Sequence, residues 1–466
     1  MAIESRTRSR SENYSLFLAI GLGWGIAIAF FFAFKGVGSF SDEGSFCAIA
    51  QGILDGRLPY KDYFNEKVPL QYFWTAFVMR FTTDGIQGAR IASTITLGSA
   101  LSLSLSRLSK WPASLGLTLL WAVIVALIGL VMRVYNNSAE STAAFLSVAC
   151  ALMIFDRRGL RSGRQALGVG LLQGLACGFH QTMVASACVV LISPWLRAWR
   201  RLFLAGFLLG LALWSGMLWY LGILQQTLEA TVLFHLNNPS MTSYFRLILE
   251  NDYPALVIWL LSLGALLIVA LQERETLWVL GWVMAVALPF FGRMDGFRLW
   301  PSTLLILTYL FSRRSGSVKL IGIAPFLVAA VAGAATMDRP ENFEWIERIN
   351  QRIKKYAGQT GTIWVGPYEP DVYCVSKRAP AAKYYFILPW ILKPGVPQEL
   401  VKEISDHKPQ LIVDVSNSTY SIKKLVPDLD RLIQEKYGLA ERDGDVRYFV
   451  LRDAPRPTSA SNPHNP

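Results

Sequence analysis

Long runs of apolar residues, separated by short polar loops, fill the first 337 residues of the chain. A helical run of about 20 apolar residues is long enough to cross the hydrocarbon core of a bilayer. We therefore predict about eleven transmembrane helices, at 14–34, 86–107, 111–132, 138–155, 165–179, 181–196, 202–222, 254–271, 276–291, 297–311 and 318–336. One alternative stays open, because 165–196 could also form a single long kinked helix.

The pattern changes after the last apolar run. An amphipathic stretch at 341–356 is followed by strand-like segments at 362–365, 411–415 and 446–451, which alternate with helical segments. Alternation of this kind is typical of a small α/β domain. No glycine-rich phosphate motif precedes any of these helices, so we do not predict a dinucleotide-binding domain.

The predicted organisation has three parts. Residues 1–337 form a transmembrane domain with a large first loop at 35–85, residues 338–453 form the α/β domain, and residues 454–466 form a disordered tail. The fold class is thus a multi-span α-helical membrane protein with a C-terminal extracytoplasmic α/β domain.

Composition supports the membrane assignment. Charged residues make up 17% of the chain, against about 25% in soluble proteins. The 129 residues from Asp338 onward hold 36 of the 78 charged residues, so the first part is poor in charge. Ordinary soluble and disordered classes are excluded.

The net charge of +12 reflects topology. Lysines and arginines gather in short loops on one side, at 107–110, 157–164, 197–201, 274 and 313–319. Such loops face the cytoplasm. We therefore expect an integral protein of the plasma (inner) membrane, with the N-terminus cytoplasmic, the first loop and the α/β domain outside, and no nucleic acid as partner.

The cysteines and glycines give weaker signals. The five cysteines lack metal or disulfide spacing, and three of them lie in apolar runs. Only Cys47 and Cys374 could meet outside the membrane, and we do not predict a bond between them. Gly170, Gly174 and Gly178 follow one another at four-residue spacing, which favours close helix packing over a functional role.

The first outside loop is dense in charge, unlike its surroundings. Asp42 and Glu43 come a few residues after the first predicted span, where an ionised carboxylate is costly unless a partner or a function compensates. Adjacent acids point in different directions, so they suit two separate roles. The alternative is a solvated loop with a helix-capping Ser-Asp-Glu sequence.

Three motifs of this loop resemble a known family. Asp42-Glu43, then Gly56-x-x-Pro59-Tyr60-x-Asp62, then Lys67-x-Pro69-Leu70 resemble the first periplasmic loop of the GT-C class of polyprenyl-phosphate-sugar-dependent glycosyltransferases. Protein O-mannosyltransferases and lipid A aminoarabinose transferases belong to that class. Relatives often have a second proline where Leu70 stands, so the subfamily stays open.

The resemblance implies a GT-C fold and an inverting reaction. A sugar leaves a polyprenyl-phosphate donor in the membrane lipid, and the hydroxyl of a glycan, lipid or protein acceptor attacks the opposite face. Asp42 is assigned as general base by its motif position, and Glu43 as a second residue that positions acceptor or metal. A divalent metal ion is possible as cofactor.

Cations are needed because negative charge develops on the departing phosphate. Lys67 and Arg90 are the nearest candidates in sequence, although Arg90 could also be an interfacial arginine that snorkels. The remaining substrate-binding candidates lie in the loop motif or in other outside turns: Asp62, Tyr135, Glu140, His180, Gln181, Arg293 and Arg298. Each has a structural alternative, such as a helix cap for Glu140, an interhelical contact for His180 and an ion pair for Arg293.

Two other classes of function compete with a transferase. Many spans with few buried charges also describe a transporter or lipid flippase, but the chain shows no duplicated half and its charges crowd into outside turns. The third class is a membrane-anchored binding module in which residues 338–466 carry the function.

Overall fold

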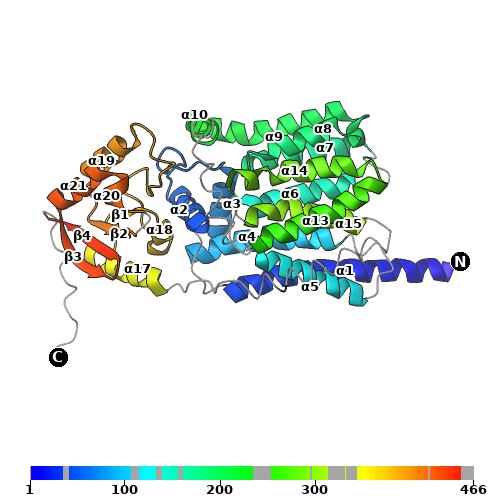
Figure 1. Ribbon diagram of the computed structural model, residues 1–466, viewed down its shortest axis with the longest axis horizontal. Helices are drawn as coiled ribbons and strands as arrows, with labels where there is room; N and C mark the ends of the chain where they lie inside the picture. Colours follow the sequence, from blue (N-terminus) through cyan, green and yellow to red (C-terminus); the bar gives the residue numbers. More distant parts are fainter. Residues whose placement is uncertain are drawn as a thin grey trace.

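The computed structural model of the chain describes residues 2–34, 41–106, 115–132, 139–155, 160, 162–234, 253–293, 296–312, 331, 344–417 and 420–452. It has a bundle of long helices at one end and a small sheet with its own helices at the other (Figure 1). Helices α2 (Ser41–Leu54), α3 (Leu70–Met79) and α18 (Asp371–Ser376) lie where the two parts meet. The predicted tail lies outside the described residues, as does the predicted last span except for residue 331.

The bundle follows the apolar runs of the sequence. Its helices are α1 (Ala2–Phe34), α4 (Gly85–Leu105), α5 (Leu115–Val131), α6 (Ala139–Ile154), α7 (Gly163–Phe179), α8 (Met183–Ile192), α9 (Arg200–Tyr220), α10 (Leu224–Leu228), α13 (Tyr253–Gln272), α14 (Thr276–Arg293) and α15 (Trp300–Ser312). Three short helices join them: η2 (Pro194–Leu196), the π-helix η3 (Glu229–Leu233) and η5 (Gly296–Leu299).

Ten of the predicted spans coincide with helices. Within the described residues, three stretches are long and apolar enough to cross a membrane by themselves, Tyr14–Phe34, Arg200–Tyr220 and Pro254–Gln272, and the other apolar helices are shorter. The total of about eleven spans therefore stays a prediction. Residues 165–196 form two helices rather than one, because the chain becomes extended at His180.

Glycines allow α7 and α9 to pack closely, as the sequence pattern predicted. A Cβ atom on Gly170 would lie 2.1 Å from the carbonyl oxygen of Phe203, and one on Gly206 would lie 2.1 Å from that of Leu167. The two backbones can approach only because neither position has a side chain. Gly178 instead faces Leu70 at the start of α3.

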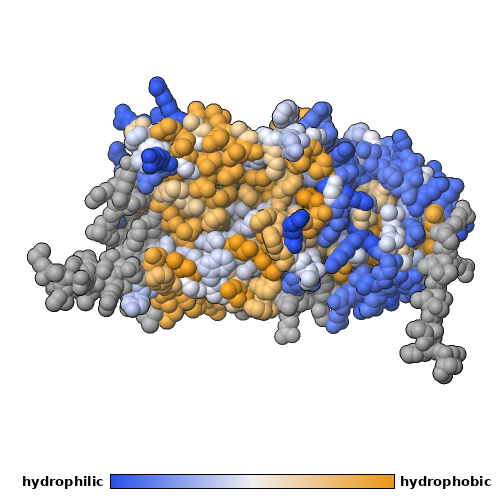
Figure 2. Space-filling model, turned by 180° about the vertical axis from the view of Figure 1, so that it is seen from behind, coloured by the Kyte–Doolittle hydropathy of each residue, from blue (hydrophilic) through white to orange (hydrophobic). Residues whose placement is uncertain are grey.

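Hydrogen bonds between helices hold the buried polar side chains of the bundle. The Ser104 and Thr308 hydroxyls are 2.8 Å apart, and Ser186 of α8 donates to the Gln173 side chain of α7 at 3.0 Å. Such bonds stabilise helix packing in an apolar environment. On the face shown in Figure 2, the bundle surface is largely apolar, whereas the surface of the sheet and its helices is largely hydrophilic.

Residues 344–452 form a four-stranded sheet with helices, which we call the C-terminal αβ unit. Strand β1 (Ile363–Gly366) pairs in parallel with β2 (Leu411–Asp414), and β4 (Val446–Leu451) is antiparallel to both β2 and β3 (Tyr437–Asp443), in the order β1-β2-β4-β3. The helices are α17 (Glu344–Ala357), α18, α19 (Val396–His407), α20 (Ile422–Leu425) and α21 (Pro427–Lys436). The edge strand β1 and its neighbour β2 are buried along their whole length.

Candidate active site

The two predicted acids lie in the first turn of α2, at the junction of the bundle and the C-terminal αβ unit. Acidic side chains are favourable there, because the first amide groups of a helix have no partners within it and carry partial positive charge. Asp42 and Glu43 point to different partners, as adjacent residues of a helix must.

Asp42 pairs with Lys67. The Lys67 ammonium lies 2.5 Å from Oδ2 of Asp42 and 5.0 Å from the centre of the Phe46 ring. The two charged side chains keep 16% and 19% of their surface exposed, so solvent or a substrate can reach them. Asp42 and Lys67 therefore form an ion pair that is partly exposed.

The backbone of Lys67 is fixed by two phenols. The Tyr60 hydroxyl donates to the Lys67 carbonyl oxygen at 2.5 Å, and the Tyr72 hydroxyl donates to the same oxygen at 3.4 Å. Burial raises the pKa of Tyr60 well above its usual value, so its phenol stays protonated and able to donate. Both tyrosines are almost completely buried. The sequence motif contains Tyr60, but sequence reasoning gave it no role.

Tyr60 has an unusual backbone conformation. Its φ of 64° lies in the left-handed region, which costs a residue other than glycine of the order of 1 kcal/mol. The amide of Tyr60 donates to the carbonyl oxygen of Tyr63 at 2.7 Å, which closes a tight turn. Local strain that surrounding contacts maintain is common at functional sites.

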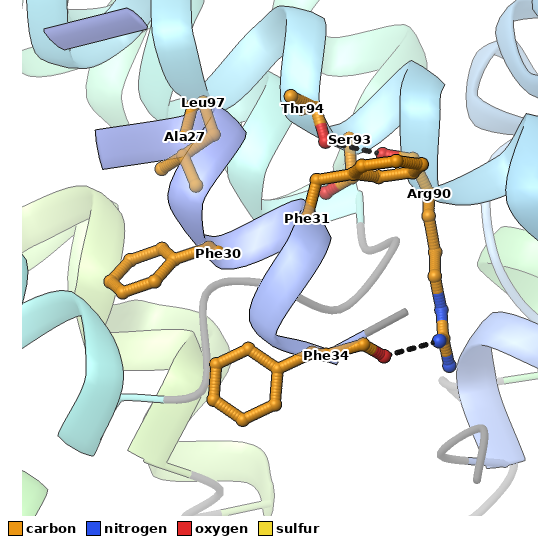
Figure 3. A pocket seen from close by; sticks show the side chains of 8 residues that line it. All are labelled: Ala27, Phe30, Phe31, Phe34, Arg90, Ser93, Thr94 and Leu97. Carbon is orange, nitrogen blue, oxygen red and sulfur yellow. Dashed lines mark hydrogen bonds between the residues drawn. The ribbon is translucent and has the colours of Figure 1, made fainter. Parts of the chain in front are cut away.

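Glu43 forms a buried ion pair with Arg90 in which both of its carboxylate oxygens accept hydrogen bonds. The Arg90 Nη2 atom lies 2.9 Å from Oε2 of Glu43, and Nε donates to both carboxylate oxygens. Nη1 donates to the carbonyl oxygen of Phe34 at 2.6 Å (Figure 3). The two charged side chains are 6% and 0% exposed. The pair thus ties the end of α1 to α2 and α4.

Arg90 occupies a buried position that the sequence did not predict. It does not snorkel to the membrane surface, because its guanidinium group is buried. Its Nε, Nη1 and Nη2 atoms donate to Glu43 and to the end of α1, and a contact with the donor phosphate stays a prediction. Glu43, predicted to position acceptor or metal, likewise has both oxygens bonded to Arg90.

A pocket between α1 and α4 lies next to this ion pair. It is lined by Ala27, Phe30, Phe31, Phe34, Arg90, Ser93, Thr94 and Leu97 (Figure 3). Its volume of about 10 Å³ holds about one water molecule. The pocket is therefore too small for a lipid chain or a sugar.

The other predicted site residues lie in separate places. Asp62 accepts a hydrogen bond from the Leu58 amide at 2.7 Å and so shapes the loop itself. His180 and Gln181 lie in the turn between α7 and α8, where His180 Nδ1 is 2.9 Å from the Thr182 hydroxyl. Arg298 lies buried in η5.

Three predicted residues have no described side chain. Tyr135 lies outside the described residues, Glu140 is the second residue of α6, and Arg293 is the last residue of α14. Within the described part of the chain, no three His, Cys, Asp or Glu side chains are arranged to hold a metal ion.

A disulfide joins α2 to the C-terminal αβ unit, contrary to the sequence expectation. Cys47 and Cys374 of α18 are bonded, with their Cα atoms 5.6 Å apart. They are buried among Ala50, Met79, Ile86 and other apolar residues. These are the two cysteines that were expected outside the membrane, but a separation of 327 residues leaves no spacing pattern from which a bond could be predicted.

Comparison with solved structures identifies the fold. Two crystal structures of ArnT from Cupriavidus metallidurans, one bound to undecaprenyl phosphate and one in the apo state, match with TM-scores of 0.59 and 0.60 at 15% and 14% identity. Each match covers 92% of this chain and 97% of ArnT. The Archaeoglobus fulgidus oligosaccharyltransferase, tethered with an acceptor peptide, matches with a TM-score of 0.51 at 11% identity over 91% of this chain and 72% of its own.

No family model and no curated protein sequence matches the chain. At these identities the structural likeness concerns the fold. ArnT, an aminoarabinose transferase, and the oligosaccharyltransferase are both GT-C glycosyltransferases. The fold that the loop motifs implied is thus confirmed: the chain has the GT-C membrane fold.

Proposed function

We propose that the protein is an integral-membrane glycosyltransferase. It transfers a sugar from a polyprenyl-phosphate donor to a hydroxyl group of a glycan, lipid or protein outside the cytoplasm, with inversion at the anomeric carbon. The observation that carries this proposal is the Asp42–Lys67 pair, a carboxylate and an ammonium 2.5 Å apart and partly exposed at the start of α2. The GT-C fold supports it, since ArnT with that fold binds undecaprenyl phosphate.

Asp42 and Lys67 match the two demands of the reaction. The acceptor oxygen forms a bond to the anomeric carbon while the bond from that carbon to the phosphate oxygen breaks. Asp42 takes the proton of the acceptor hydroxyl, and the polyprenyl phosphate leaves with the bonding electrons. The Lys67 ammonium stabilises the negative charge that develops on this phosphate.

Glu43 and Arg90 have a supporting role in this proposal. Their buried pair anchors the first turn of α2 to α1 and α4, which keeps Asp42 in place. Tyr135, Glu140, His180, Gln181, Arg293 and Arg298 stay candidates for contacts with donor or acceptor.

The disulfide supports the proposed topology. Disulfides form and persist in oxidising compartments and are rare in the cytosol. The Cys47–Cys374 bond therefore favours an extracytoplasmic position for both α2 and the C-terminal αβ unit. We infer a plasma (inner) membrane protein whose N-terminus is cytoplasmic.

An Asp42→Asn variant tests the proposed function. Membrane vesicles that contain the full chain are supplied with radiolabelled polyprenyl-phosphate sugars, and loss of label from the lipid is measured. Without its base, the variant should transfer about 10²- to 10⁴-fold more slowly. The matched control is Asp55→Asn, which changes an exposed carboxylate directly after α2.

Two outcomes would contradict the proposal. Transfer at the wild-type rate by Asp42→Asn would show that Asp42 is not the base. Movement of intact labelled lipid across the bilayer, with no cleavage by the wild-type protein, would identify a flippase instead.

A further inference from the structure

Helix α18 of the C-terminal αβ unit packs directly against α2 (Figure 1). The Cys47–Cys374 disulfide joins the two helices. At the end of α18, the Lys377 ammonium donates to the carbonyl oxygen of Thr83 at 2.9 Å, just before α4 begins. At the start of α18, Asp371 meets the first turn of α2. The αβ unit thus contacts the helix that carries Asp42.

The contact of Asp371 with α2 is unusually close. A Cβ atom on Gly44 would lie 1.6 Å from Oδ1 and 2.7 Å from the amide nitrogen of Asp371. No side chain other than hydrogen fits between them, which explains the glycine directly after Asp42-Glu43. The Asp371 side chain therefore packs against the backbone of the first turn of α2, which also carries Asp42 and Glu43.

The charge of Asp371 needs compensation, because only 2% of this residue is exposed. Two sources of positive charge are close. The first-turn amides of α2 carry partial positive charge, and Arg90 interacts electrostatically with Asp371 as well as with Glu43. Arg90 thus binds Glu43 directly and also lies within electrostatic range of Asp371, which comes from a different part of the fold.

We propose that Asp371 is a positioning residue for the transfer reaction, which fixes the first turn of α2, and thereby Asp42, from the C-terminal αβ unit. This inference rests on the proposed function. The Cys47–Cys374 bond, one turn further along α2, keeps α18 in register with that helix. The αβ unit then completes the active site rather than forming a separate module.

A positioning role predicts an effect on turnover more than on donor binding. Lys67, which we assign to the phosphate, lies outside α2 and is held by Tyr60 and Tyr72. Loss of the Asp371 charge should therefore lower kcat about 10-fold and leave KM for the donor within about twofold. If Asp371 only holds the two parts together, its substitution should lower the melting temperature without lowering kcat selectively over KM.

The test uses Asp371→Asn in the full chain, reconstituted in lipid nanodiscs. Hydrogen–deuterium exchange is measured at the amides of residues 42–46, with the kinetic assay in parallel. Exchange should become about 10-fold faster in the variant, corresponding to about 1.4 kcal/mol. The control is Asp406→Asn, an exposed carboxylate near the end of α19, which should change neither readout.

A second pair of variants guards against a folding defect. Gly44→Ala should slow turnover, because its methyl group displaces Asp371. In the Gly44→Ala/Asp371→Gly double variant the space is restored, so its defect should be no larger than that of the worse single variant. Strictly additive defects would overturn the proposed contact.

The failures of the two proposals can be told apart. If the wild-type protein transfers no sugar, the proposed function fails, while the exchange measurement still shows whether Asp371 orders α2. If transfer occurs, but Asp371→Asn leaves both kcat and amide exchange within twofold of wild type, the positioning role is wrong.

Discussion

The candidate active site depends on residues that fix other residues. Lys67 can stand next to Asp42 because two buried tyrosines bind its carbonyl oxygen. Tyr60 makes the shorter of these bonds from a left-handed backbone conformation. The phenol at position 60 therefore helps to fix the backbone from which the Lys67 side chain extends to Asp42.

A Tyr60→Phe variant should keep the fold and misplace Lys67. Loss of one hydrogen bond costs about 0.5 to 1.5 kcal/mol, so transfer should slow by roughly 2- to 10-fold, as measured in the vesicle assay. Tyr448→Phe is the control, because the Tyr448 hydroxyl is buried without a hydrogen-bond partner in the described part of the structure. Equal rates for the two variants would show that the Tyr60 bond does not position Lys67.

For single residues, the sequence predicted contacts between residues close in the chain but not contacts between residues far apart in it. Asp42 and Lys67 lie within one loop motif, and the structure brings them together. Asp371 and Cys374 reach α2 from the far end of the chain, and a contact between such distant residues leaves no periodic or spacing signal. The partners of Arg90 were missed for the same reason, since the guanidinium bonds to two other helices.

Among the elements, α7 and α9 pack with their backbones in close contact. Glycines on both helices face the backbone of the other, which makes the fit sensitive to a single methyl group. Gly170 meets the Phe203 carbonyl, whereas Gly168, on the same helix, has open space around it. The two positions form a natural pair for comparison.

Gly170→Ala should destabilise the bundle, and Gly168→Ala should not. The added Cβ at position 170 would lie 2.1 Å from a backbone oxygen, so the helices must separate, at a cost of about 1 to 3 kcal/mol. At position 168 alanine gains up to about 1 kcal/mol of helix propensity. Thermal unfolding of the detergent-solubilised protein should show a melting temperature a few degrees lower for Gly170→Ala only; equal melting temperatures would contradict the packing argument.

Elements with a strong pattern were predicted, and an edge strand was not. The helices of the bundle could be predicted because each predicted membrane span is apolar along its whole length and stands out from the polar loops. Strand β3 was not predicted, because Glu441 and Asp443 break its apolar pattern. It also follows α21 directly, with no turn residues to mark its start. Charged side chains are common on edge strands, where they protect against unwanted pairing.

For the whole molecule, the two parts differ in surface and in their expected environment. On the face shown in Figure 2, the bundle presents mostly apolar side chains and the C-terminal αβ unit mostly hydrophilic ones. With the disulfide between them, the proposed topology places the αβ unit outside and the start of α9 inside. Two exposed positions distinguish these sides: Glu435 of α21 and Arg200 of α9.

Labelling of single cysteines tests this topology. In right-side-out vesicles, with Cys188 replaced by serine, a membrane-impermeant maleimide should label Glu435→Cys at once. It should label Arg200→Cys only after permeabilisation, because the proposed topology places that loop in the cytoplasm. The reverse pattern would refute the orientation, and with it the assignment of the active site to the outside.

The order of synthesis gives the disulfide one more consequence. A ribosome makes Cys47 first and must add another 327 residues before Cys374 exists. During that interval the thiol of α2 has no native partner, and the helix that bears Asp42 has no α18 beside it. A nascent chain therefore carries the whole first loop before the α18 contacts of α2 exist, so the positioning that we propose for Asp42 becomes available only after Cys374 has been made.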